Sequence, residues 1–137
     1  MSNSRLAQET RRCLVRLTGG DHGALVGQFV FPPGYLGFAG HFPGNPVLPG
    51  VCMVQAAVVM QEAWHHTPVT MGDVVSAKWF APVKPGIELT IEAKTPRAGS
   101  AERPGMVIKT RISCLGDKVA ELALRVTGLP VAGEGAA

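Results

Sequence analysis

The sequence predicts an α+β domain in which an antiparallel sheet wraps one long apolar helix. Three observations carry this prediction: a strongly apolar helical stretch over residues 50–66, two strand-like stretches before it and four after it. A helix that is apolar on nearly every side has to be buried on most of them. Strand-like stretches joined by short turns favour antiparallel pairing. The predicted order is therefore β-β-α-β-β-β-β.

The two stretches before the helix predict a β-hairpin. Residues 10–17 partly alternate between charged and apolar side chains, and residues 24–31 are rich in β-forming residues. Residues 18–23, TGGDHG, lie between them and are typical of a turn. Two strands separated by such a turn pair as a hairpin.

The helix and the later strands are bounded by proline and glycine. Pro49 and Gly50 precede the helix, and Thr67-Pro68 ends it. Turns are predicted at residues 83–86 and 115–118. The four strands are expected over residues 73–81, 88–94, 106–114 and 119–127. Residues 130–137 are small and polar and predict a frayed tail, so residues 1–137 are interpreted as a single domain with a core of about residues 10–128.

Composition excludes several classes of protein. The 137 residues are 46% hydrophobic, which suits one globular domain with a real core. The net charge is +3, without a Lys/Arg block interleaved with aromatics, so no nucleic-acid partner is expected. No apolar run is long enough to insert in a membrane. The three cysteines, Cys13, Cys52 and Cys114, are far apart, which argues for a reducing, cytoplasmic location and against zinc.

The most informative stretch is GHFPGNPVLPGV, residues 40–51, which holds three prolines and three glycines. Each proline fixes its own φ and pushes the preceding residue toward extended geometry. His41 therefore lies on a stiff loop that leads into a helix N-terminus, an arrangement suited to polarising a carbonyl. From these residues alone, a helix begun by Pro-Gly and a loop histidine with ordinary hydrogen bonds is the alternative interpretation.

The stretch GHFPGNPVLPGV resembles the signature of the FabA/FabZ-like 3-hydroxyacyl-acyl carrier protein dehydratases of fatty-acid synthesis, which have the hotdog fold. Residues 77–86, AKWFAPVKPG, resemble the strand–turn segment F-x-x-P-V-x-P-G-D of that family. The likeness covers about residues 23–128. It implies a hotdog homodimer with two equivalent tunnels, acting on an acyl chain carried by acyl carrier protein or CoA. The helix and strand with which those dehydratases usually begin have no counterpart in this sequence.

The resemblance also assigns the site residues. It makes His41 the catalytic base, and it makes the carbonyl of Val47 an acceptor for the imidazole. The Gly50 N–H would bind the thioester oxygen, with Pro49 and Val51 as further substrate-binding residues. An enolate oxygen that develops when C2 loses its proton needs a fixed donor, and a helix N-terminus supplies both N–H and dipole. A side chain at position 50 would keep the thioester from approaching. No metal and no bound cofactor are expected, because the phosphopantetheine arm arrives with the substrate.

Gln55 departs from the family pattern. Those dehydratases carry Glu or Asp at this position of the central helix, where it serves the active site of the partner subunit. Glutamine donates and accepts hydrogen bonds but has no proton to transfer. Losing one general acid typically costs about 10²–10⁴-fold in rate. Gln55 could still hold the substrate hydroxyl while His41 acts as both base and acid.

Residues beyond the motif are further candidates for a role in the site. Glu62 lies on the face of Gln55 but about 10 Å further along the axis, and an i, i+4 pair with His66 is the favoured interpretation. Cys52 could touch a substrate channel, although a buried small residue is the favoured description. Candidates for an apolar lining, with core packing as the alternative for each, are Met53, Val54, Val58, Trp79 and Phe80.

The sequence thus predicts a 3-hydroxyacyl thioester dehydratase that gives a trans-2-enoyl product and is weakened by Gln55. A non-catalytic hotdog module that binds an acyl chain or scaffolds a complex is the first alternative. A hotdog thioesterase is the second, and it gains nothing from Gln55, since it too uses an acidic residue on this helix.

Overall fold

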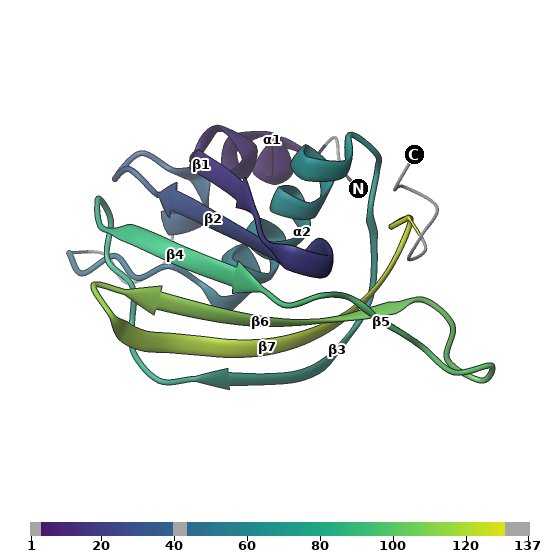
Figure 1. The fold of residues 1–137 in the computed structure, drawn as a ribbon. Helices are drawn as coiled ribbons and strands as arrows, with labels where there is room; N and C mark the ends of the chain where they lie inside the picture. Colours follow the sequence, from purple (N-terminus) through teal and green to yellow (C-terminus); the bar gives the residue numbers. More distant parts are fainter. Residues whose placement is uncertain (1–3, 40–43, 131–137) are drawn as a thin grey trace.

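A computed structural model of the chain describes residues 4–39 and 44–130. Figure 1 shows its helices and strands, which in chain order are α1 (Arg5–Arg12), β1 (Leu14–Gly19), η1 (Asp21–Gly23), β2 (Leu25–Val30), η2 (Leu36–Phe38), α2 (Gly50–His65), β3 (Thr70–Trp79), β4 (Glu88–Ala93), β5 (Arg97–Ala98), β6 (Met106–Cys114) and β7 (Asp117–Thr127).

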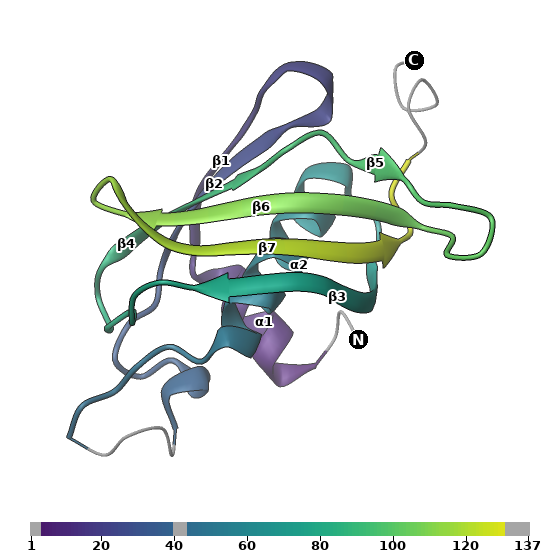
Figure 2. The same cartoon turned by 90° about the horizontal axis from the view of Figure 1, so that it is seen from below.

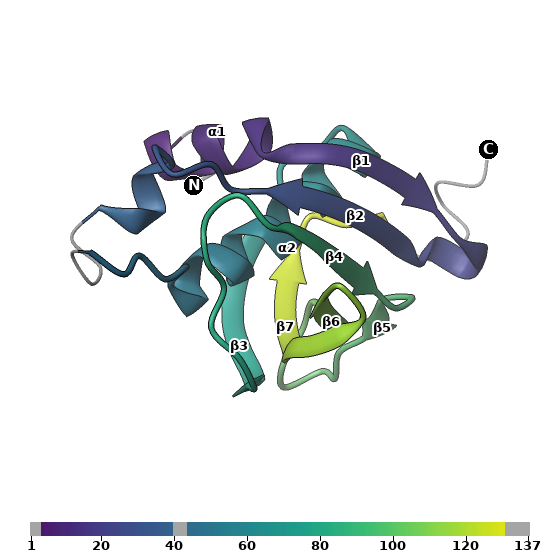
Figure 3. The same ribbon diagram turned by 90° about the vertical axis from the view of Figure 1, so that its left-hand side faces the viewer.

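The strands form a seven-stranded sheet in the order β1-β2-β4-β6-β7-β3, with β5 paired to β6. Every pairing is antiparallel, including the predicted hairpin of β1 and β2. The sheet curves around α2, which lies in its concave side (Figure 3). This arrangement confirms the predicted hotdog architecture.

Helix α2 begins where the sequence predicts and ends one residue earlier. Pro49 is its N-cap, with extended backbone angles, and His66 ends it in the left-handed conformation with its N–H donating to the Glu62 carbonyl at 2.9 Å. Most of the helix is buried, as expected from its apolar sequence. Val51 and Trp64 are exceptions, with 65% and 42% of their surface exposed. Val51 shares one side of α2 with the partly exposed Val54 and Gln55, and this side stays uncovered by the chain's own sheet.

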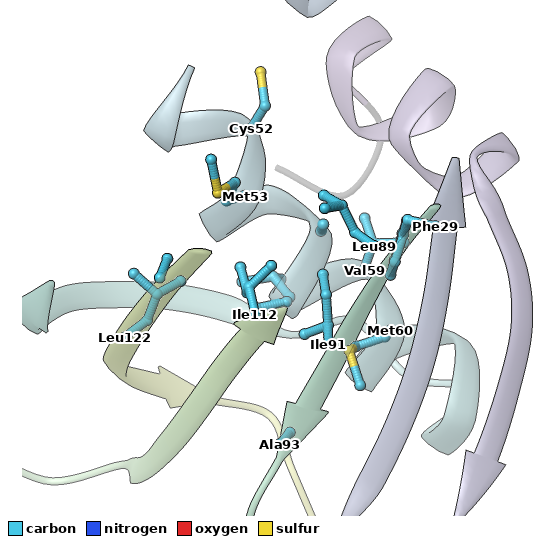
Figure 4. Packing of buried hydrophobic residues seen from close by; sticks show 14 of the residues in the cluster. Phe29, Cys52, Met53, Val59, Met60, Leu89, Ile91, Ala93, Ile112 and Leu122 are labelled. Atoms are coloured by element: carbon cyan, nitrogen blue, oxygen red, sulfur yellow. The ribbon is translucent and has the colours of Figure 1, made fainter. Parts of the chain in front are cut away.

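The core lies between α2 and the concave face of the sheet (Figure 4). Met53, Val59 and Met60 come from α2 and are at most 4% exposed. They pack among inward side chains that alternate along the central strands, chiefly Leu89, Ile91, Ile112 and Leu122. At about 25 cal/mol per Å² of apolar surface removed from water, this interface is the main stabilising contribution of the fold.

The N-terminal segment corrects the sequence-based expectation. A helix, α1, precedes the first strand, and residues 10–13, predicted as strand, belong to its last turn and C-cap. The Ser4 hydroxyl caps it by accepting the Ala7 N–H at 3.0 Å. Thr10 points inward and is fully buried. The alternation of residues 10–17 misled because its first half belongs to a helix that packs against α2 (Figure 2).

Strand β3 forms one edge of the sheet and pairs only with β7 among the described residues. From Val74 to Phe80 its side chains are exposed, whichever face of the sheet they are on. The large apolar members of this run are between 46% and 52% exposed: Val74, Val75, Trp79 and Phe80. An edge strand with unpaired backbone groups and apolar side chains is a template for pairing with another chain.

Candidate functional site

His41 itself lies outside the described residues, together with Gly40, Phe42 and Pro43. The chain on both sides of this segment is tied to the fold. The Ala39 N–H donates to the Leu36 carbonyl at 3.0 Å, and the Leu48 N–H donates to the Val83 carbonyl at 2.8 Å. The second bond joins the two stretches on which the family resemblance was based, so they lie side by side in the fold.

An aromatic cluster supports the chain that leads to this loop. Phe31 and Tyr35 have ring centroids 4.8 Å apart, and Tyr35 meets Phe38 edge-on at 5.9 Å. The Tyr35 hydroxyl and the Thr10 hydroxyl share a buried hydrogen bond of 2.6 Å, while Thr10 also donates to the Leu6 carbonyl. Burial raises the pKa of Tyr35 far above its ordinary value. The cluster therefore ties the loop base to α1 and holds the tyrosine as a neutral structural donor.

The N-terminus of α2 carries backbone donors without a side-chain cap. Its N-cap is Pro49, whose side chain makes no capping bond. The Cys52 N–H donates to the Pro49 carbonyl at 3.0 Å. This leaves the Gly50 and Val51 amides at the positive end of the helix dipole, where an oxyanion is stabilised. Val47 and Pro49, the other two predicted binding residues, are partly buried in the segment that leads into this turn.

Trp79 imposes a second, steric constraint that favours glycine at position 50. A Cβ built on Gly50 would lie 2.8 Å from Trp79 Cζ2 and 2.9 Å from Cη2. The indole of the edge strand thus packs directly against the first residue of α2. The sequence predicted glycine here for the approach of a thioester, a role that stays a prediction. The close contact between Trp79 and the helix is the constraint found in the structure.

A groove runs along the uncovered side of α2 and holds Gln55. Its volume is about 180 Å³, and it is lined by Val51, Val54, Gln55, Val58, Glu62, Val69 and Met71. Val54 and Val58 therefore line a groove as predicted. Met53 instead packs in the core, and the exposed Phe80 ring lies 5.3 Å from the Lys118 Nζ.

Glu62 lies in the wall of the same groove and is held by partners from two other elements. Its Oε1 is 3.4 Å from Arg11 Nη2 of α1, and its Oε2 accepts the Val69 N–H at 2.8 Å. Only 6% of the Glu62 side chain is exposed, against 40% for Arg11. Sequence reasoning favoured an i, i+4 pair with His66. The printed sequence could not reveal the Arg11 contact, because its partner is 51 positions away.

Cys52 and the candidate metal ligands support no second catalytic site. Cys52 is 1% exposed, and its sulfur lies where a Cβ on Gly37 would be 2.5 Å away, so the buried-residue interpretation holds. Burial also raises the Cys52 pKa. Among residues 4–39 and 44–130, no group of three or more His, Cys, Asp and Glu side chains could hold a metal ion. Within the same ranges, no helix has the length and hydropathy to cross a bilayer.

The comparisons with known proteins decide the family. The model of the ApeI-like family, described as ApeI dehydratase, matches residues 18–107. The chain belongs to the ApeI-like family. The match includes the loop of His41, the start of α2, Gln55 and the segment around Trp79.

A curated relative supports this assignment. The chain is 34% identical over 106 residues to the 3-hydroxyacyl-[acyl-carrier-protein] dehydratase FabZ of a Caulobacter species, covering 68% of this chain. This chain spans 62% of that relative's length. This share is below two thirds, so the dehydratase activity of that relative is a proposal for this chain.

Solved structures share the fold. The dehydratase heterocomplex ApeI:P from Xenorhabdus doucetiae has a TM-score of 0.67 at 16% identity, covering 83% of this chain and 96% of that one. A variant of the fluoroacetyl-CoA-specific thioesterase FlK has a TM-score of 0.56 at 17% identity, covering 84% and 88%. At these identities the likeness concerns the fold alone.

Proposed function

We propose that this chain is a subunit of a dehydratase that eliminates water from a 3-hydroxyacyl thioester and gives a trans-2-enoyl thioester. The observation that carries the proposal is the groove beside the uncapped N-terminus of α2, next to the anchored ends of the His41 loop. The acyl chain arrives on acyl carrier protein or CoA, in the cytoplasm, and its phosphopantetheine arm is part of the substrate. The reaction needs no bound cofactor.

The proposed elimination uses three groups. His41 takes the C2 proton, and the electron pair forms the enolate while the Gly50 N–H and the helix dipole stabilise the oxygen. The enolate then re-forms the thioester carbonyl as the C2–C3 double bond forms and the C3–O bond breaks. The imidazolium returns its proton to the departing hydroxyl, which leaves as water. Gln55 holds that hydroxyl by hydrogen bonding and transfers no proton.

We further propose that a second subunit completes the site across the β3 edge. The exposed apolar run of β3 and the uncovered side of α2 adjoin each other, since Trp79 packs on Gly50. A homodimer joined at this edge would cover both. The Xenorhabdus ApeI:P assembly is a dehydratase heterocomplex. A partner that differs from this chain and carries a carboxylate in place of Gln55 is therefore the alternative that a co-expression experiment would reveal.

Gln55 also favours one other function, a non-catalytic acyl-binding module. In that case the groove would bind the chain, and no general acid would be needed. The thioesterase alternative has no comparable observation, because its support is a likeness of fold.

The test replaces the two polar residues of the site. His41→Ala should abolish conversion of 3-hydroxyacyl thioesters, measured by the absorbance of the enoyl product. Gln55→Glu should raise the rate at least about ten-fold, because it restores a proton donor, provided that burial under the second subunit keeps the carboxyl protonated. Gln28→Glu makes the same substitution on β2, away from the groove, and should leave the rate unchanged. Tight acyl binding without any turnover would favour the non-catalytic module, and turnover unaffected by His41→Ala would refute the mechanism.

A further inference from the structure

Two lysines face each other on the convex face of the sheet, just beyond the end of β4. The Lys94 N–H donates to the Lys109 carbonyl at 2.8 Å, which continues the pairing of β4 with β6. Their chain neighbours Ala93 and Thr110 are 3% and 4% exposed and point inward. Successive side chains of a strand point to opposite faces, so both lysines point outward.

Arg97 joins the two lysines from β5. It pairs with Val107 of β6, which precedes Lys109 by two residues, so Arg97 shares the convex face with Lys109. Directly opposite residues of an antiparallel pair have Cβ atoms about 5 Å apart, and diagonal neighbours about 7–8 Å. Lys94 and Arg97 therefore both begin within about 8 Å of Lys109.

The three cations border a hollow with a volume of about 430 Å³. Its lining consists of basic, hydroxyl and small residues: Ala24, Lys94, Thr95, Arg97 and Lys109. None of these described residues is acidic, and none of the three cations takes part in an ion pair within residues 4–39 and 44–130. The lysines also border an adjoining hollow that does contain carboxylates, those of Glu92 and Glu121. The hollow beside Arg97 is therefore the more strongly cationic of the two.

The chemistry of this lining suits an anion with several oxygens. Like charges that face each other across a strand pair destabilise it, and a bound anion would remove that cost. The Arg97 guanidinium presents a planar fork that matches two phosphate oxygens, while an ammonium binds phosphate as a point charge. The Thr95 hydroxyl is a further donor. The volume is within the range of about 300–1,000 Å³ that is typical of small-molecule sites, so the hollow has room for two phosphoryl groups.

We propose that this hollow is an anion site that binds a diphosphate group through Lys94, Arg97 and Lys109. The diphosphate is either free or part of a larger molecule such as a nucleotide. The competing explanation is that the cations are solvated and only add to the net positive charge. A site predicts saturable binding that depends on these residues, whereas a diffuse attraction depends equally on any exposed lysine. The inference is independent of the proposed dehydration, because the hollow shares no residue with the groove along α2.

The experiment titrates the full chain with sodium diphosphate in a calorimeter, at low ionic strength, where surface charges are least screened. The wild type should bind one diphosphate per chain. Lys109→Gln and Arg97→Gln should each weaken binding about five-fold, the upper end of what an exposed ion pair supplies. Arg97→Lys keeps the charge but loses the fork, so it should weaken binding by about two-fold. Lys84→Gln is the matched control: Lys84 is exposed, forms no ion pair among the described residues and does not line the hollow.

A second titration, with ADP, separates the two sources of the diphosphate. ADP binding as tightly as diphosphate assigns the hollow to a larger molecule, and ADP binding more than about ten-fold more weakly assigns it to the free anion. No saturable binding of diphosphate by the wild type would overturn the inference. Equal weakening in Lys84→Gln and Lys109→Gln would overturn it too, because it would show a diffuse attraction. All three substituted side chains are exposed, so each variant should fold as the wild type does.

Discussion

Gly50→Ala separates two reasons for glycine at the start of α2. The added Cβ would meet Trp79 Cζ2 at 2.8 Å, so the indole has to recede by about 0.7 Å to reach ordinary contact. Overpacking of this kind costs about 1–3 kcal/mol. Alanine recovers up to about 1 kcal/mol over glycine in a helix. Gly50→Ala should therefore lower the free energy of unfolding by about 0–3 kcal/mol.

The same substitution should act differently once the indole is gone. In a Trp79→Leu background the obstructing ring atoms are absent, so Gly50→Ala should stabilise the protein by about 0.5–1 kcal/mol. Urea unfolding at one fixed protein concentration measures all four proteins of the cycle. Gly34→Ala is the control, since a Cβ there meets no heavy atom within 4 Å.

Activity gives the second readout of this cycle. If glycine also admits the thioester to the Gly50 amide, the double variant should regain stability but stay slow, because its new methyl group still occupies the approach. Equal effects of Gly50→Ala in both backgrounds would refute the Trp79 contact as the structural constraint. Full recovery of activity in the double variant would refute the thioester role.

Two further predictions concern the edge strand and the thiols. Val75→Lys should give the mass of a monomer in light scattering, because a charge on an edge strand blocks pairing. Val15→Lys, on the opposite edge strand β1, should leave the mass of the wild type. Equal masses for both variants would contradict the proposed interface. Burial, followed by the charge of Glu9, raises the Cys13 pKa to about 11. Iodoacetamide at neutral pH should therefore label the partly exposed Cys114 first, as read by peptide mass spectrometry, and the labelling rate of Cys13 should still rise above pH 9. Early labelling of Cys13 would contradict its burial.

Most of the fold could be predicted from the sequence because the residues that bound its helices and strands are local signals. Pro49-Gly50 and Thr67-Pro68 bound α2 within about one residue of its observed ends, and residues 106–114 were predicted with the bounds that β6 has. Helix α1 could not be predicted by the same means. Its last residues belong to the partly alternating stretch 10–17, and Thr10 bonds to Tyr35 while α1 packs against α2, contacts that no local pattern signals.

The same distinction between local and distant contacts applies to the candidate site. Gly50 and Gln55 are close in sequence and lie on one helix, so their spacing placed them correctly relative to each other. The contacts of Trp79 with Gly50 and of Arg11 with Glu62 join distant segments. No local pattern signals them, because a tryptophan on a strand and an arginine on a helix are compatible with many neighbours. These two contacts therefore emerged only from the three-dimensional structure.

The uncovered side of α2 connects oligomeric state to chemistry. An apolar helix pattern predicts burial but does not say which chain provides the cover. Val51 is 65% exposed and Val74 46% exposed, yet the groove that holds Gln55 opens on this same side of the molecule. A subunit docked at the β3 edge would exclude water from the groove, which strengthens every electrostatic interaction inside it. Val75→Lys should accordingly lower turnover as well as mass, although the substitution touches none of the residues proposed to act on the substrate.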